Sequence, residues 1–368
     1  MFLIDRRYIR YFDWISFFII LIISAIGLAF VYSATYQPDV AYSIFFKKQL
    51  FGMISGIGIY LLFSYMHYQS LMRWGYFAYF FVLLLLVFTI IKGSIGMGAQ
   101  RWISIGFFKL QPSELTKLFF PAFITYYLYT QREDFSYKWY DFSTIIAVMG
   151  LTFILVRKQP DLGTALIILF SGVILLWLAG LNNKFFITGF IFLIISAPIS
   201  WTLLKDYQKK RILVFLGQGE KLKERYQIEQ SKIAIGSGGL TGKGFLQGTQ
   251  NQLQFLPESR TDFIFSVVAE ELGLVGTITI LLLYIILFLH QISLIKTFTS
   301  PFMQLLGFGL IIHIILSVII NICMVLGLLP VVGIPLPLLS YGLSNLWITF
   351  ASLGWFNSIA MRRFYVIA

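Results

Sequence analysis

Long apolar stretches, separated by short polar connections, run through almost the whole chain. An α-helix needs roughly 20 apolar residues to cross the hydrocarbon core of a bilayer, and the stretches have about this length. Ten of them are expected to form membrane-spanning helices, near residues 14–33, 49–66, 73–91, 114–130, 142–157, 162–181, 184–204, 264–290, 302–328 and 337–361. The pattern predicts an all-α polytopic membrane protein of about ten transmembrane helices, with both termini on one side of the membrane.

One connection, residues 205–262 between the seventh and eighth predicted helices, is far longer than the others. It begins with a basic cluster at 205–211, continues through a charged stretch and then becomes Gly-rich. Apolar residues recur between the charges, which favours a segment lying back on the membrane surface over a disordered tether. We expect the whole chain, 1–368, to form a single integral membrane domain that contains this long loop.

The orientation of the chain depends on its first helix. The first apolar stretch is too long for the core of a cleaved signal peptide, and no small-residue cleavage site follows it, so we expect it to remain as a signal anchor. Arg6, Arg7 and Arg10 precede it, which places both termini in the cytoplasm by the positive-inside rule. The loop at 205–262 is then extracytoplasmic.

Composition excludes an ordinary soluble enzyme, because 58% of the residues are apolar and only 12% are charged. A soluble domain carries about 25% charged residues. Lys and Arg number 28 against 16 Asp and Glu, and 18 of the 28 fall on the predicted outer side. The positive-inside rule therefore barely decides the orientation, and the basic excess on the outer side indicates an anionic ligand.

The conspicuous polar motifs all lie in odd-numbered connections between the predicted helices, or at the helix ends beside them. They are GAQRWIS and QPSELTK in the third connection, QPDLGT in the fifth, LPESRTD at the end of the seventh and PLPLLSYGLS in the ninth. Parity puts all of them at one membrane face, whichever way the protein is inserted. Polar elements that converge on one face are what a single binding site requires.

Glu114 and Asp161 each follow a proline at the predicted start of a helix. A carboxylate there favours the positive helix end, which is a purely structural role. Lys117 follows Glu114 by three residues on the same helix face, and charges inside a membrane usually pair and line a cavity. We therefore predict a buried pair between Glu114 and Lys117.

The segment from Gly236 to Gly248 holds six glycines with Lys243 among them, but it is not a Walker A motif. That motif needs a glycine five residues before its Gly-Lys step and a Ser or Thr after it. Ser237 and Gly244 occupy these two positions. Backbone amides of such a loop could still hold a phosphate, and a flexible turn fits the pattern equally well.

Asp262 has two interpretations. With Ser259 it could form a capping box for the eighth helix, or it could act in chemistry. That helix would be about 40 Å long and exceed the hydrocarbon core, so either it breaks near Gly273 or Asp262 stands above the bilayer. Glu270 and Glu271 lie ~80° and ~180° around the helix from Asp262, so we pair neither with it.

The residues indicate no metal centre. Cys323 is alone, and His67, His290 and His313 lack the spacing of metal ligands. Asn321 is more typical of a hydrogen bond between helices than of a ligand contact. No cofactor is implied, and the sequence leaves open whether a divalent cation accompanies a bound pyrophosphate.

Two activities fit a cationic site over one membrane face. One is glycosyl transfer from a polyprenyl pyrophosphate, in which a carboxylate takes a proton from the acceptor hydroxyl and cations stabilise the departing pyrophosphate. The other is lipid transport, in which the same cations hold the headgroup while intramembrane pairs switch. Physical reasoning from the residues does not separate them.

Several long strings resemble the SEDS family (shape, elongation, division and sporulation proteins). They are GAQRWISIGFFKLQPSELTK, KQPDLGTA, QSKIAIGSGGLTGKGFLQGTQNQLQFLPESRTDFIFSVVAEELGLVG and NICMVLGLLPVVGIPLPLLSYGLS. The resemblance spans nearly the whole chain and is closer to the elongation type than to the division type. It implies a glycosyltransferase of the bacterial cell membrane that polymerises lipid II into peptidoglycan, with its active cavity facing outward. A lipid II flippase is the alternative.

The resemblance also implies roles for particular residues. The essential carboxylate of the family matches Asp262, which family models treat as the base on the acceptor sugar. Other family positions match Arg101, Glu114, Lys117 and Asp161, with Lys243 and Arg260 as candidates for binding the pyrophosphate. The implied partners are a class B penicillin-binding protein, which is a transpeptidase, and the rod-shape elongation machinery; no nucleic acid is implied.

One motif departs from the family pattern. Family members usually read SYGGS where this chain reads SYGLS, so Leu343 replaces a glycine between the candidate site residues Ser340 and Ser344. If that glycine needs a positive φ or a close contact, Leu343 would lower stability or reshape that edge of the site.

Overall fold

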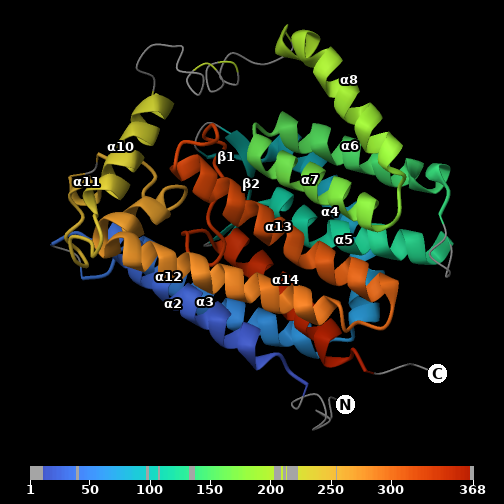
Figure 1. The fold of residues 1–368 in the computed structure, drawn as a ribbon, viewed down its shortest axis with the longest axis horizontal. Coiled ribbons are helices and arrows are strands. Elements are labelled where there is room, and N and C mark those ends of the chain that lie inside the picture. The colour runs from blue at the N-terminus through green and yellow to red at the C-terminus, as the bar shows by residue number, and fades with distance from the viewer. Residues whose placement is uncertain are drawn as a thin grey trace.

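The computed structural model describes residues 11–38, 41–96, 99–106, 108–131, 137–202, 209, 213, 223–253 and 255–364. Each of the ten predicted stretches holds a long helix. They are α2 (Trp14–Ala34), α3 (Ile44–Tyr65), α4 (Tyr68–Lys92), α5 (Pro112–Gln131), α6 (Ser143–Lys158), α7 (Leu162–Leu178), α8 (Asn183–Thr202), α12 (Ile264–Ile295), α13 (Pro301–Val325) and α14 (Leu343–Met361). Figure 1 shows them as one bundle, from which α8 extends outward.

Among the described residues, five segments are both long and apolar enough to cross a membrane: α2, α4, Trp139–Lys158, α12 and α13. The third of these is α6 with a preceding 3-10 turn, Trp139–Phe142. The helical fold is confirmed, while the number of helices that cross the membrane stays a prediction.

Several helices begin at a side chain that accepts a hydrogen bond from the first turn. Asp13, Ser43, Asp161 and Ser300 do this for α2, α3, α7 and α13. Such caps satisfy amides that have no partner inside the helix. The hydrocarbon core offers these amides no water, so caps matter more in a membrane protein.

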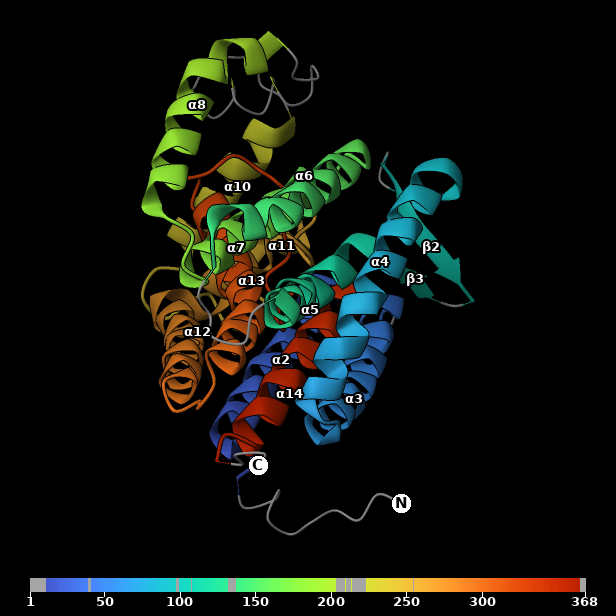
Figure 2. The same cartoon turned by 90° about the vertical axis from the view of Figure 1, so that its right-hand side faces the viewer.

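The helix α14 lies in the middle of the bundle, against α3, α4, α5 and α13, as Figure 2 shows. Nearly all of its residues are buried. Its contact with α3 depends on small residues, because a Cβ on Gly354 would lie 2.4 Å from the backbone oxygen of Tyr60. Small residues let membrane helices approach closely enough to pack without a hydrophobic driving force.

The start of α2 and the end of α14 lie at the same end of the bundle. The amide of Asp13 donates to Oδ1 of Asn357 over 3.0 Å. The described ends of the chain are therefore on one side, as the parity of ten helices predicts.

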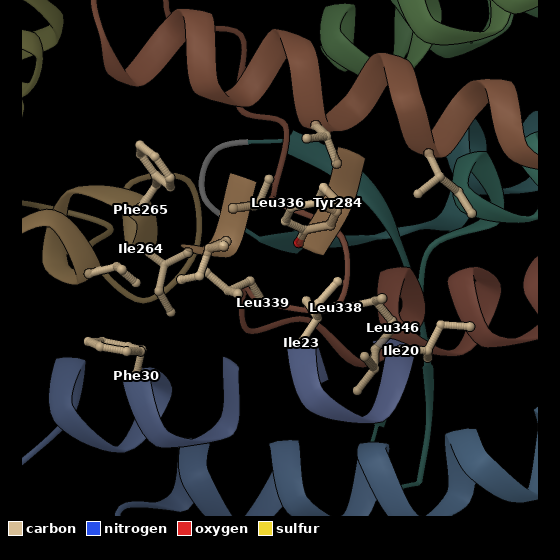
Figure 3. Packing of buried hydrophobic residues seen from close by; sticks show 14 of the residues in the cluster. Ile20, Ile23, Phe30, Ile264, Phe265, Tyr284, Leu336, Leu338, Leu339 and Leu346 are labelled. Atoms are coloured by element: carbon tan, nitrogen blue, oxygen red, sulfur yellow. The ribbon is translucent and has the colours of Figure 1, made fainter. Parts of the chain in front are cut away.

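The largest apolar core forms where α2, α12 and the segment before α14 meet. Figure 3 shows Ile20, Ile23, Tyr284, Leu338 and Leu339 packed together in it. The hydroxyl of Tyr284 donates to the carbonyl of Pro337, so the polar end of a buried ring has a partner. This core fixes the chain just before α14 against two long helices.

A small sheet and two short helices depart from the predicted all-helical pattern. Strands β1 (Ser94–Gly96), β2 (Ala99–Ile105) and β3 (Phe108–Leu110) form an antiparallel sheet in that order, between α4 and α5. Within the long connection lie α10 (Lys223–Ser237) and α11 (Thr249–Gln252). Of the basic cluster at 205–211, only Lys209 is among the described residues.

The helix α12 breaks at Gly273, which has φ 65° and ψ −160°. This confirms the first of the two outcomes predicted from its length. The Gly-rich loop supplies partners for the interrupted backbone: Leu274 and Val275 donate to the carbonyls of Gly239 and Leu240 over 2.9 and 3.1 Å. A Cβ at Gly273 would lie 2.3 Å from the amide nitrogen of Gly242, so only glycine fits.

Candidate active site

The motif-bearing connections meet at one end of the bundle, where α5, α7, α12 and α14 begin. The segment before α14 contacts the start of α12, and the first turn of α14 contacts the start of α5. The predicted convergence of the motifs is confirmed for these segments.

Asp161 joins three of the elements around the site. Its Oδ1 caps α7 by accepting from the amide of Thr164 over 3.2 Å. Its Oδ2 accepts from Nε2 of Gln111 over 2.6 Å and from Oγ of Ser113 over 3.1 Å. Nη1 of Arg101, on β2, lies 3.7 Å from Oδ1. The predicted structural role at the helix start is therefore confirmed, and the same carboxylate also joins a polar network with Gln111, Ser113 and Arg101.

Glu114 and Lys117 form the predicted buried ion pair. Their Oε2 and Nζ atoms are 2.7 Å apart, and the side chains are only 6% and 3% exposed. Nδ2 of Asn345, in the first turn of α14, also donates to Oε2 of Glu114 over 3.1 Å. The pair is thus joined to the segment that carries the SYGLS motif.

Asp262 does not cap α12, so the capping interpretation is wrong. The N-cap is Phe263, which makes no side-chain cap bond, and Asp262 precedes it. A capping box needs Asp262 three residues inside the helix, whereas α12 begins only at Ile264. The side chain of Asp262 is partly exposed.

The backbone around Asp262 is held through three successive carbonyls. Those of Arg260 and Thr261 accept from the amide of Tyr341 over 2.9 Å and from Oγ of Ser340 over 2.6 Å. The carbonyl of Asp262 itself accepts from Nδ2 of Asn321 over 2.8 Å. The position of the carboxylate is therefore set by α13 and by the segment before α14.

The same segment lies between Asp262 and the start of α7. A Cβ at Gly333 would be 3.5 Å from Oδ2 of Asp262. A Cβ at Gly163 would be 2.8 Å from the oxygen of Val332 and 2.7 Å from Cγ1 of Ile334. Residues 332–334 thus separate the Asp262 carboxylate from the α7 start that Asp161 caps.

Ser340 and Ser344 both bind backbone groups. Oγ of Ser340 accepts from the amide of Leu336 over 2.8 Å in addition to donating to Thr261. Oγ of Ser344 donates to the carbonyl of Lys109 over 3.0 Å and accepts from the amide of Gln111 over 3.4 Å. Two side chains therefore hold the start of α14 against β3, α5 and the Asp262 segment.

Leu343 is accommodated in this chain. It is the first residue of α14 and has no positive φ, and its side chain is buried. Its Cδ2 lies 2.5 Å from where a Cβ on Gly52 would be, so a glycine on α3 makes room for it. The positive φ that would have made Leu343 costly is therefore absent, and the side chain packs against α3.

Lys243 lies in a different cluster. Its Nζ is 2.7 Å from Oε1 of Glu270 and 2.8 Å from Oγ1 of Thr249. Its amide and that of Gly244 donate to the carbonyls of Glu270 and Glu271, both over 3.0 Å. The Gly-rich loop is therefore neither a phosphate cradle at these two amides nor a loose turn, because it is bonded to the α12 break.

The long chain as a whole matches one family. Residues 13–365 match the model of the FtsW/RodA/SpoVE cell cycle proteins. The chain belongs to this family. The peptidoglycan glycosyltransferase MrdB of Escherichia coli K12 is 41% identical over 292 residues, which cover 79% of this chain and 78% of that protein. The resemblance drawn from the motifs is confirmed.

Solved structures of family members share the fold. A chain from a structure titled for the coordination of polymerization and crosslinking by a peptidoglycan synthase complex has a TM-score of 0.80 and 27% identity, covering 96% of this chain and 98% of that one. The rod shape determining protein RodA of Thermus thermophilus has a TM-score of 0.72 and 26% identity, covering 96% and 98%. This family member is a multi-pass membrane protein.

Sequence reasoning missed several residues of this candidate site. Asn345 binds Glu114, and Gln111 and Ser113 bind Asp161. None of the three is ionisable, so a search for charged residues passes over them. Glu270 and Glu271 form the second cluster, and two adjacent acids inside a predicted membrane helix were the available signal for it. Across the described parts of the chain, no three His, Cys, Asp or Glu side chains gather in a way that could hold a metal ion.

Proposed function

We propose that this protein polymerises lipid II into peptidoglycan strands during cell elongation and cell-shape maintenance, with Asp262 as the general base. The curated relative at 41% identity is named a peptidoglycan glycosyltransferase, and a structural neighbour is named for rod shape. The observation that carries the residue assignment is the threefold backbone anchoring of Asp262 beside the other motifs.

In this reaction Asp262 takes the proton from the acceptor sugar hydroxyl. The hydroxyl oxygen then forms a bond to the anomeric carbon of the second lipid-linked sugar, while the bond from that carbon to the pyrophosphate breaks. The electron pair leaves with the pyrophosphate. A base at a fixed position is effective here because proton transfer requires hydrogen-bond distance to the acceptor.

The cations of the site stabilise the pyrophosphate as it departs. We assign Arg101, Lys117 and Arg260 to this role, because Arg101 and Lys117 pair with Asp161 and Glu114 at the motif-bearing end of the bundle and Arg260 is two residues from Asp262. Glu114 and Asp161 hold the first two in place, and Ser340 and Ser344 hold the backbone. Lys243 becomes a lesser candidate because Glu270 engages its ammonium.

The site faces the extracytoplasmic side of the bacterial inner membrane in this proposal, where the long loop lies. The acceptor and donor are both anchored in that membrane by their polyprenyl chains. The partner is a class B penicillin-binding protein that crosslinks the new strand, in line with the synthase complex of which one neighbour is part. The elongation machinery is the proposed setting.

Polymerisation by purified protein tests this function. Protein in detergent, supplied with lipid II and the transpeptidase partner, is expected to make glycan polymer although no membrane separates two compartments. Lipid II translocation in liposomes without any polymer in detergent would replace the proposal with a flippase.

Asp262→Ala tests the assignment of the base. The variant is expected to fold and express normally but to make no polymer, because the acceptor hydroxyl loses its base. Glu258→Gln is the matched control, since it removes a negative charge four residues away and is expected to keep activity. Full activity of Asp262→Ala would contradict the assignment.

A further inference from the structure

The guanidinium of Arg260 lies against an aromatic ring from another helix. Its Cζ is 3.9 Å from the centroid of the Phe45 ring, in the first turn of α3. A guanidinium at this distance from a ring face is attracted by the electron density of that face. Phe45 and Arg260 are 215 positions apart in the sequence, and Arg260 is two positions from Asp262.

The ring of Phe45 is itself held in place. The ring of Tyr341 meets it edge-on, with centroids 5.3 Å apart. One turn later on α3, Gln49 donates from Nε2 to the carbonyl of Ser340 over 3.1 Å and accepts from the amide of Gly342 over 3.3 Å. The first turn of α3 is therefore joined to the segment that anchors the backbone of Arg260.

Arg260 differs from the other cations assigned to the pyrophosphate. Arg101 and Lys117 each have a carboxylate within 3.7 Å, and so does Lys243. Among the described residues, Arg260 has no ion pair, and an aromatic ring takes the place of the acid.

A ring and an acid hold a cation with different consequences. A carboxylate cancels most of the charge and occupies N–H donors, whereas a ring contacts the face of the guanidinium and leaves the donors at its edge available. An arginine whose charge is not cancelled attracts a pyrophosphate more strongly, and its planar donors match phosphate oxygens.

We propose that Phe45 is a positioning residue for the transferase reaction, which holds Arg260 ready for the donor pyrophosphate without neutralising its charge. This inference rests on the proposed function, in which Arg260 binds the pyrophosphate. Phe45 itself touches no reacting atom. Its contribution is transmitted through the Arg260 side chain.

A double-mutant cycle of Phe45→Leu and Arg260→Gln tests the inference, with lipid II polymerisation as the readout. Phe45→Leu is expected to lower kcat/KM by about two- to thirtyfold, the range that a cation–π contact supports. The effect should fall on kcat as well as on KM, because Arg260 holds the bound pyrophosphate and stabilises it as it departs. In the Arg260→Gln background, Phe45→Leu should have no further effect.

Two further variants separate positioning from packing. Phe45→Trp retains an aromatic face and is expected to keep kcat/KM close to the unmodified protein. Phe46→Leu is the matched control, because Phe46 lies in the same turn but stacks with Tyr42 at 5.2 Å between centroids. Phe46→Leu is expected to lower the melting temperature about as much as Phe45→Leu does, but to leave KM unchanged.

Each failure has a distinct meaning. If Arg260→Gln retains full activity, Arg260 does not bind the pyrophosphate, and that part of the proposed function fails together with this inference. If Arg260→Gln is impaired but Phe45→Leu acts independently of it, or no more strongly than Phe46→Leu, only the role of Phe45 is overturned.

Discussion

The buried carboxylates of this protein differ in what stabilises them. Glu114 and Glu270 each face an ammonium at 2.7 Å. Glu271 accepts instead from Oγ of Ser33 and from the amide of Leu246. A buried charge without such partners is costly. Substituting one member of such a pair is therefore expected to destabilise the protein, because its partner is left unpaired.

Glu114→Gln is expected to lower stability as well as activity. The substitution leaves the ammonium of Lys117 buried without its counter-charge, and breaking a buried pair from one side costs about 3–5 kcal/mol. The melting temperature of purified protein measures this. The double variant Glu114→Gln with Lys117→Met should recover part of the loss, because no unpaired charge remains. Unchanged melting of the single variant would contradict a stabilising pair.

At the scale of elements, the break in α12 and the Gly-rich loop form one unit. The loop's amides and carbonyls replace the hydrogen bonds that the helix loses at Gly273. The side chain of Lys243 and the backbone amide of Gln250 both donate to Oε1 of Glu270, over 2.7 and 3.0 Å. The part of α12 around its break is therefore tied to the Gly-rich loop.

Gly273→Ala is expected to destabilise this unit. Its backbone conformation is essentially restricted to glycine and costs about 1–3 kcal/mol for other residues, and the added Cβ would collide with Gly242. Thermal unfolding should show a lower midpoint and polymerisation should fall. Gly150→Ala on α6 is the control, because its Cβ meets nothing within 4 Å, and it should be neutral or slightly stabilising.

For the whole molecule, the orientation of the bundle in the membrane decides which side the motifs face. The motifs share one end, and the described chain ends share the other. Leu240, in the Gly-rich loop, and Trp139, before α6, are both well exposed, at 69% and 62%. Parity places them on opposite sides of the membrane.

Labelling of introduced cysteines in intact cells tests the outward orientation. With Cys323→Ser as background, Leu240→Cys is expected to react with a membrane-impermeant maleimide. Trp139→Cys should react only after the cells are permeabilised. The reverse pattern would show that the site faces the cytoplasm and would overturn the proposed orientation.

The sequence by itself determined where the helices lie along the chain and one local ion pair. Apolar length defines a membrane helix because the bilayer thickness is fixed, and each predicted stretch holds a helix within a few residues at most ends. The pair of Glu114 and Lys117 was predictable because a spacing of three places both on one helix face. The family resemblance added the proposed role of Asp262 as the general base.

Only the tertiary structure decided which distant residues meet. Helix periodicity carries no information on contacts between helices, so it could not pair Lys243 with Glu270, Asn345 with Glu114 or Arg260 with Phe45. The strands of β1–β3 are too short and irregular for a period to reveal them. The anchoring of the Asp262 backbone likewise depends on how α13 and α14 pack, because packing alone brings these donors to its carbonyls.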